Sequence, residues 1–225
     1  MRWLTYPRVG SVGEVMTFRL DKIDSLFPTP LVHFTLTDHL ALNADLLREI
    51  AARQSAEDGV ARSNQLGWHS ASDLFERREP AQAQLAETIK QAIAEATRKL
   101  APKAPFERFN LVCEGWINVN PAGAYNAPHE HIGSFWSGTY YVANSGGAGR
   151  TGTGGAIEFL APHRLATPGG LIKAPMTAGK ARFRPVAGTL LLFPSTLMHW
   201  VHPNDSDQDR VTIAFNASVA ITGRA

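Results

Sequence analysis

The amino-acid sequence predicts a mainly β protein, a β-sandwich or jelly roll with helices packed against one side. Two observations support this fold class. Apolar residues at helical spacing occur before Glu107, whereas the chain from Glu107 onward consists of short β-rich runs separated by glycine and proline. Helices followed by many short strands are typical of a layered β fold with supporting helices.

Two helices are expected in the first part of the chain. Leucines and Ile50 recur at helical intervals within residues 39–56, and Asn43 is placed to cap a helix that begins at about Ala44. A second helix is expected over Pro80–Leu100, where an apolar stripe recurs at helical spacing and the proline suits the first turn. The segment "APKAP" then ends it.

Five later runs predict strands: "FNLVCEGWINVN", "SFWSGTYYVA", "GGAIEFLAP", "GTLLLFP" and "RVTIAFNASV". Between the second and third runs lies the glycine-rich stretch at residues 144–155, "NSGGAGRTGTGG". It is expected to be a surface connection, although mobile loops beside active sites have the same composition. It lacks the strand-turn-helix context of a phosphate-binding loop, so a nucleotide site is not expected.

The length and the charge predict one ordinary globular domain. The 225 residues carry 22 lysines and arginines against 20 aspartates and glutamates. Residues 1–105 are expected to supply N-terminal strands and supporting helices, and residues 106–220 the jelly-roll core. No basic tract is present, so no nucleic-acid partner is indicated. The composition does not predict an oligomeric state.

Cysteine content and hydropathy predict a cytoplasmic location. Cys113 is the only cysteine, so the chain forms no intramolecular disulfide, and a reducing compartment fits. The first residues contain no apolar segment of signal-peptide length, and no later run has the length needed to span a bilayer. Neither secretion nor a membrane location is therefore expected.

Three histidines suggest a metal site. In an extended chain, His129 and His131 point to the same face, whereas Glu130 between them points to the opposite face. A strand with this pattern offers two ligands to one metal. His199 follows a buried strand, "GTLLLFP", at a point where a barrel strand meets its mouth. For an isolated pair, hydrogen-bonded histidines at a strand end are the simpler interpretation.

Arg210 opens an otherwise apolar strand, where a buried charge needs a partner. A small dicarboxylate is one candidate, bound as a bidentate pair. Thr212 and Ala214 share its face, the first as a hydrogen-bond donor and the second as a small side chain that leaves space. The opposite face is expected to be core, with Val211, Ile213 and Phe215. The alternative for Arg210 is a surface charge or an ion pair with Asp205, Asp207 or Asp209.

Other polar residues have two interpretations. Trp116, Asn118 and Asn120 share a strand face, and the two amides either bind substrate or co-substrate or are satisfied residues of an edge strand. His202 is expected to face solvent or to lie behind the metal ligands. The remaining histidines are expected to be structural: His33, His39, His69 and His163.

In the order and spacing of these elements, the chain resembles the double-stranded β-helix oxygenases that use Fe(II) and 2-oxoglutarate. The corresponding segments are "HEH" at 129–131, "SGTYY" at 137–141, "MHWV" at 198–201 and "RVT" at 210–212. The chain is most similar to a bacterial and phage subgroup of such oxygenases with HxH, SGxYY and FPSxLxHxVxPN motifs. The resemblance is good from about Trp116 to Ser218.

The resemblance implies a double-stranded β-helix fold and assigns roles to several residues. It implies that His129 and His199 bind iron and that Arg210 binds the distal carboxylate of 2-oxoglutarate. Tyr141 corresponds to a tyrosine that assists this arginine, and Thr212 stands where the family has serine or threonine. Asn118 is not assigned by the resemblance, but its place on the strand face of Trp116 makes it a candidate co-substrate contact.

One position departs from the superfamily pattern, because His131 stands where a carboxylate usually completes the iron site. Imidazole binds Fe(II) well, so His129, His131 and His199 form a reasonable ligand set. If His131 does not bind, Glu130 or Glu158 could supply a carboxylate. Glu130 would need a bulge in its strand to reach the metal.

The implied activity is that of a 2-oxoglutarate-dependent dioxygenase, which hydroxylates a substrate and releases succinate and CO₂. The substrate is open between a small molecule and a protein side chain. One alternative is a cupin-like metalloenzyme that uses three histidines without 2-oxoglutarate, which leaves Arg210 and Thr212 without a role. The other is a non-enzymatic binding module, since one fold hosts many functions.

Overall fold

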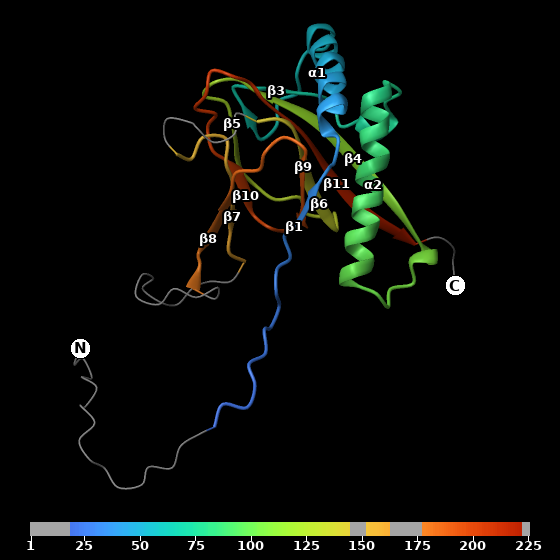
Figure 1. The fold of residues 1–225 in the computed structure, drawn as a ribbon, viewed down its shortest axis with the longest axis vertical. Helices are drawn as coiled ribbons and strands as arrows, with labels where there is room; N and C mark the ends of the chain where they lie inside the picture. The colour runs from blue at the N-terminus through green and yellow to red at the C-terminus, as the bar shows by residue number, and fades with distance from the viewer. Residues whose placement is uncertain (1–18, 145–151, 163–176, 222–225) are drawn as a thin grey trace, which may run out of the picture.

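The computed structural model describes residues 19–144, 152–162 and 177–221. Two antiparallel sheets face each other, and both long helices cover the outer side of the larger sheet (Figure 1). The helices are α1 (His39–Ala56) and α2 (Pro80–Leu100), with short 3₁₀ turns η1 (Leu74–Glu76) and η2 (Phe106–Arg108). Neither helix of the described segments is both long and apolar enough to cross a membrane.

The larger sheet has six strands in the order β1-β9-β6-β11-β4-β3. Their bounds are Val32–Thr35, Thr189–Pro194, Trp136–Ala143, Arg210–Ile221, Phe109–Asn120 and Trp68–His69. The smaller sheet has five strands in the order β2-β5-β10-β7-β8. Their bounds are Asn64–Gln65, Tyr125–His129, His199–Val201, Ile157–Leu160 and Lys180–Phe183. This arrangement confirms the predicted jelly roll with supporting helices.

The second helix agrees with its prediction at both ends, but the prediction for the first helix is wrong at its start. Helix α1 begins at His39, and Asp38 precedes it in a left-handed conformation without a side-chain cap. Asn43 therefore lies inside the helix and caps nothing. Its side chain is buried, where Nδ2 donates to the carbonyl of Val142 at 2.8 Å and Oδ1 accepts from the Tyr140 hydroxyl at 2.7 Å. The hydrogen bonds to β6 explain why an asparagine occupies this buried position, and the spacing of residues within the helix could not predict them.

Asn43→Ala should lower the free energy of unfolding by about 2 to 4 kcal/mol, because the Tyr140 hydroxyl and the Val142 carbonyl would stay buried without a partner. Tyr140→Phe removes only the first of these bonds and should cost about 1 kcal/mol. Urea unfolding followed by circular dichroism measures both values. Equal losses for the two variants would show that the bond to Val142 contributes nothing.

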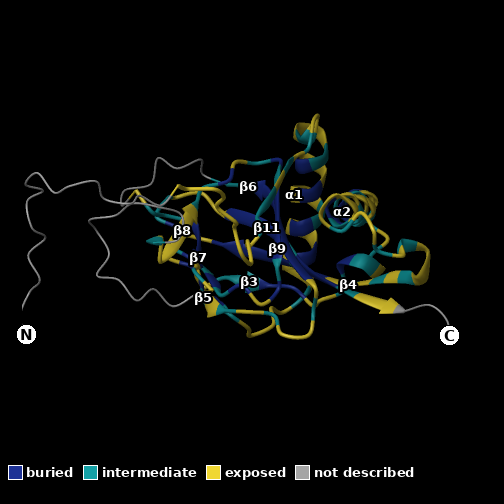
Figure 2. Ribbon diagram, turned by 90° about the horizontal axis from the view of Figure 1, so that it is seen from below, coloured by how far each residue is buried: buried dark blue, intermediate teal, exposed yellow. Residues whose placement is uncertain are grey.

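Two hydrophobic cores lie on the two sides of the larger sheet. The outer core joins the helices to β6, β9 and β11, and the inner core joins β6 and β9 to β7 and β10 across the sandwich. Figure 2 shows that the central strands of the larger sheet are buried along most of their length, between the helices and the smaller sheet.

Strand β11 has the alternation that its sequence predicts. Val211, Ile213 and Phe215 belong to the outer core, under the helices. Arg210, Thr212 and Ala214 line the cavity between the two sheets. The same alternation on β6 directs Tyr140 to the outer core and Tyr141 to the inner core. Because side chains on a strand alternate strictly, the inner faces of these two strands build one wall of the cavity.

Candidate active site

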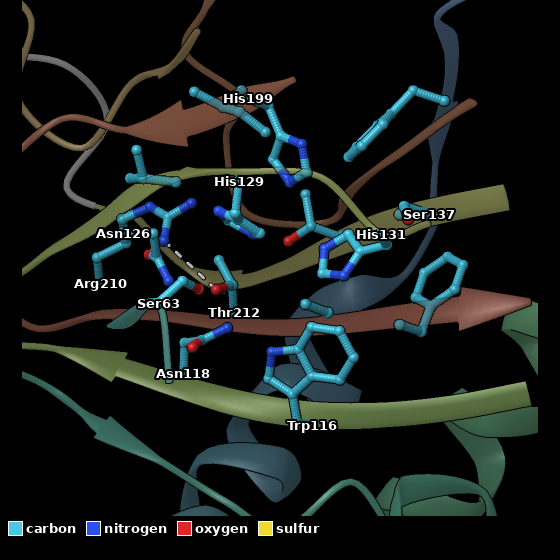
Figure 3. Close-up of a pocket in the computed structure, with 17 residues that line it drawn as sticks. Ser63, Trp116, Asn118, Asn126, His129, His131, Ser137, His199, Arg210 and Thr212 are labelled. Atoms are coloured by element: carbon cyan, nitrogen blue, oxygen red, sulfur yellow. Dashed lines mark hydrogen bonds between the residues drawn. The ribbon is translucent and has the colours of Figure 1, made fainter. Parts of the chain in front are cut away.

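The structure brings the three predicted histidines together at one end of the cavity. His129 ends β5 and His199 begins β10, and the two residues are paired in the antiparallel register. His131 lies two residues beyond β5, where its backbone N–H donates to the carbonyl of Ser195 at 2.8 Å. One nitrogen from each imidazole lies within 4.8 Å of the others. Figure 3 shows the three rings turned toward one another.

Two of the imidazoles are oriented by backbone carbonyls. His129 Nδ1 lies 2.6 Å from the carbonyl oxygen of Ala127, and His199 Nδ1 lies 2.8 Å from that of Leu197. Since a carbonyl only accepts, each Nδ1 carries the proton and donates it. The Nε2 of each ring is left with a free lone pair. This is the usual arrangement behind a metal-binding histidine.

Burial keeps all three rings neutral at physiological pH. It lowers the pKa of His199 to about 3 and that of His131 to about 4, and in both cases the neighbouring His129 adds to the effect. The pKa of His129 is also lowered by burial, partly offset by its bond to Ala127. Only a neutral imidazole offers a lone pair to a metal, so a set of three neutral rings fits a divalent cation such as Fe(II).

Arg210 is a buried cation without an anionic partner. The residue is 2% exposed, and its guanidinium makes no ion pair within the described part of the chain. Its hydrogen bond to the Thr212 hydroxyl is long, at 3.4 Å, and its Nε has no acceptor. The central carbon of the guanidinium lies 5.1 Å from the centre of the Tyr141 ring. The predicted alternative of an ion pair with a nearby aspartate is not observed.

Further unpartnered polar atoms lie beside this arginine. The Tyr141 hydroxyl and the side-chain oxygens of Asn118 and Asn120 are buried and have no hydrogen-bond partner in the described structure. Burial raises the pKa of Tyr141, against the opposing effect of the Arg210 charge, so the hydroxyl stays protonated and can donate. Buried polar groups normally have partners, so these atoms indicate a binding site for a polar ligand. The donors of Arg210 and Tyr141 suit an anionic end, whereas the two amide oxygens need a hydrogen-bond donor.

The cavity connects the histidines to the arginine. Trp116, Asn118 and Thr212 lie along one side, as Figure 3 shows. Strand registers explain why, because Arg210 pairs with Asn120 and Thr212 with Asn118 across β11 and β4. The ring of Trp116 lies 5.6 Å from that of His131 on one side and 5.6 Å from that of His69 on the other. His69 is thus buried packing behind the site, as its structural interpretation predicts.

The sequence interpretation missed several cavity residues: Ser63, Asn126, Ser137 and Thr139. Two of them had a visible signal, because Ser137 and Thr139 alternate with Tyr141 on β6 and must share its face. No sequence pattern indicated that Ser63 and Asn126 would line the cavity. They reach the cavity through the pairing of β2 with β5, which no local pattern encodes.

Neither alternative carboxylate belongs to the histidine cluster. Glu130 is exposed. Glu158 is 1% exposed but holds Lys180 and Arg182, each at 3.0 Å, together with His202. Burial alone would raise the pKa of Glu158, but hydrogen bonds from these three groups lower it to about 2. His202 is half-buried and outside the cluster, and His163 and residues 145–151 of the glycine-rich stretch lie outside the described residues.

His131→Ala should weaken Fe(II) binding by about tenfold or more, as expected for losing a metal ligand or the group that orients one. His131→Asp should bind at least as tightly as the natural protein, because a carboxylate at this position can also reach the metal. Glu130→Gln should change little, since this side chain is exposed. Anaerobic Fe(II) affinities measure all three. Normal binding by His131→Ala with loss in Glu130→Gln would transfer the third ligand to Glu130.

Comparisons with known proteins agree with this geometry. Residues 114–216 match a family model described as "Putative 2OG-Fe(II) oxygenase". The matched segment contains all three histidines and also Tyr141 and Arg210. No curated protein sequence matches the chain.

Several solved structures share the fold at low sequence identity. A prolyl-4-hydroxylase from Pseudomonas putida is 17% identical, with a TM-score of 0.59 over 84% of this chain and 91% of its own. A prolyl hydroxylase from Trichoplax adhaerens, solved with a hypoxia inducible factor peptide, is 14% identical, with a TM-score of 0.60 over 84% and 83%. The α-ketoglutarate dependent epimerase SnoN from nogalamycin biosynthesis is 14% identical, with a TM-score of 0.61 over 86% and 79%.

The structural likeness establishes the double-stranded β-helix fold, and the family match covers the strands that carry the site. Residues 114–216, a little less than half of the chain, are therefore similar to the 2OG-Fe(II) oxygenases, and the three histidines within this segment could hold a metal ion.

Proposed function

We propose that this protein hydroxylates an organic substrate, with dioxygen and 2-oxoglutarate consumed and succinate and CO₂ released. The balance is one C–H bond of the substrate converted to C–O–H for each molecule of 2-oxoglutarate decarboxylated. The observation that supports this proposal best is the Arg210 guanidinium, which is buried, charged and without an ionic partner in the described structure. We also propose a cytoplasmic location, on the basis of the single cysteine.

The arginine and its neighbours are suited to a carboxylate. An anionic partner offsets the desolvation cost of a buried guanidinium, and the planar donors of arginine match the two oxygens of a carboxylate. In our proposal Arg210 holds the distal carboxylate of 2-oxoglutarate, with added donors from the Tyr141 and Thr212 hydroxyls. Asn118 lies on the same wall, where its amide N–H can donate to the co-substrate and its unpartnered oxygen can accept from the substrate.

The histidines are suited to Fe(II). The two rings oriented by Ala127 and Leu197 present unprotonated Nε2 atoms, and His131 faces them. Three neutral ligands leave the charge of the metal intact, and the dianionic co-substrate can offset it. When bound, iron and 2-oxoglutarate supply the activation of dioxygen. The chain contributes orientation, and the apolar side chains of Ile157, Phe193 and Val201 exclude water from the cavity wall.

An anaerobic titration of the Fe(II)-loaded protein with 2-oxoglutarate tests this function. The chelate should produce a weak visible charge-transfer band that saturates at one equivalent. Iron binding without the band would favour the three-histidine metalloenzyme that does not use 2-oxoglutarate. Failure to bind iron at all would favour a non-enzymatic binding module.

A further inference from the structure

Asn216 connects His131 to a carboxylate outside the metal cluster. This asparagine lies on β11, two positions beyond Ala214, and is 4% exposed. Its Oδ1 accepts from the Ser137 hydroxyl at 2.7 Å, and its Nδ2 donates to Glu114 Oε1 at 2.9 Å. The same Nδ2 lies 3.3 Å from His131 Nδ1. The three partners come from β6, β4 and the turn after β5.

The partners determine which way the amide faces. An ionised carboxylate only accepts hydrogen bonds, so the side of Asn216 that faces Glu114 must be the NH₂ group. The Ser137 hydroxyl can donate, which agrees with an oxygen on the opposite side. Reversing the amide would set its oxygen against the carboxylate of Glu114. The amide nitrogen is therefore held toward both Glu114 and His131.

This orientation gives His131 a different proton position from the other two histidines. Because the amide N–H is a donor, His131 Nδ1 is the acceptor, and a neutral ring then carries its proton on Nε2. His129 and His199 have the opposite arrangement, with protonated Nδ1 atoms that donate to carbonyl oxygens. An Nε2 that carries a proton has no lone pair for a metal. For His131 to bind through Nε2, its proton must move to Nδ1, and the Asn216 N–H that faces this ring then has no acceptor.

We infer that Asn216, held by Glu114, is a positioning residue that keeps His131 in its Nε2-protonated form and so makes it the weakest of the three metal ligands. The amide donor is suited to a carboxylate at position 131, which would accept the N–H and still reach a metal. The proton position of His131 does not depend on the proposed function, whereas the effect on iron affinity rests on it.

The proton positions can be measured directly in the metal-free protein. Long-range ¹H–¹⁵N correlation spectra at neutral pH distinguish the two neutral forms of each histidine. We expect His131 to be protonated at Nε2, and His129 and His199 at Nδ1. In Asn216→Leu the donor is absent, so His131 should lose this preference while the other two rings keep theirs. An Nδ1-protonated His131 in the natural protein would overturn the inference.

A variant with the hydrogen bond reversed tests the consequence for the metal. In the double variant Glu114→Gln/Asn216→Asp, the glutamine amide donates to the aspartate, whose carboxylate can accept from His131 Nδ1–H. Co(II) affinity, followed by its visible absorption, should rise by about ten- to a hundredfold, the range typical for groups behind metal ligands. Glu107 is an exposed glutamate of η2, and Glu107→Gln serves as the matched control for the loss of a glutamate. This variant should bind Co(II) like the natural protein.

A third substitution shows whether the gain acts through His131. Adding His131→Ala to the double variant should remove the gain. A folded double variant with unchanged or weaker Co(II) affinity, or a gain that persists without His131, would overturn the role of Asn216. If neither the natural protein nor any variant binds Co(II), the proposed function fails, and the spectra of the metal-free protein alone decide the proton position.

Discussion

Arg210→Met is expected to lower the affinity for 2-oxoglutarate by two to three orders of magnitude while Fe(II) remains bound. Losing one partner of a buried ion pair costs about 3 to 5 kcal/mol, and each 1.4 kcal/mol is a tenfold change in affinity. Methionine keeps an apolar stem of similar length but removes the planar donors. Isothermal titration of the metal-loaded protein under anaerobic conditions measures the change.

The same substitution should not destabilise the ligand-free protein. Arg210 is 2% exposed without an ionic partner in the described structure, so removing its charge relieves a desolvation cost. Without 2-oxoglutarate, we expect Arg210→Met to have the same melting temperature as the natural protein or a higher one. Adding 2-oxoglutarate should raise the melting temperature of the natural protein but not that of Arg210→Met. Arg182→Met makes the same change in an arginine bound to Glu158 and should keep normal co-substrate affinity. Equal affinities for both variants would show that Arg210 does not contact 2-oxoglutarate.

His199→Leu is expected to abolish stoichiometric Fe(II) binding in a folded protein. His199 is 6% exposed, and its ring lies 4.8 Å from that of Phe193, so alanine would leave a cavity. Leucine fills most of this volume but has no nitrogen. Since the Nε2 of His199 is free of other partners in our interpretation, its loss removes a strong ligand, and metal analysis after dialysis should find far less than one equivalent.

His202→Leu is the matched control, because the same substitution is made three residues later. His202 contacts Glu158 on the far side of the smaller sheet and lies outside the histidine cluster. It should retain one equivalent of iron. Stoichiometric iron in a folded His199→Leu protein would remove His199 from the ligand set. Loss of iron in both variants would instead indicate a general weakening of β10.

Much of this protein follows from local patterns in its sequence. The apolar stripe of Pro80–Leu100 is enough to define α2, because a helix needs only its own residues to form its hydrogen bonds. The alternation in "RVTIAFNASV" separates Arg210 and Thr212 from Ile213, because successive side chains of a strand point to opposite faces. The chain order of the histidines and Arg210 is enough to indicate a resemblance to the oxygenases that use Fe(II) and 2-oxoglutarate.

Contacts between distant segments decided the rest. Asn43 has the local features of a helix cap, yet its hydrogen-bond partners lie on β6, about a hundred residues later in the chain. These hydrogen bonds explain why the asparagine is buried inside the helix. Asn216 meets Glu114 and His131 because β11 pairs with β4 and the turn after β5 folds over both. Strand register is set by the burial of whole sheets, and so no local pattern could show which atom of His131 faces a donor.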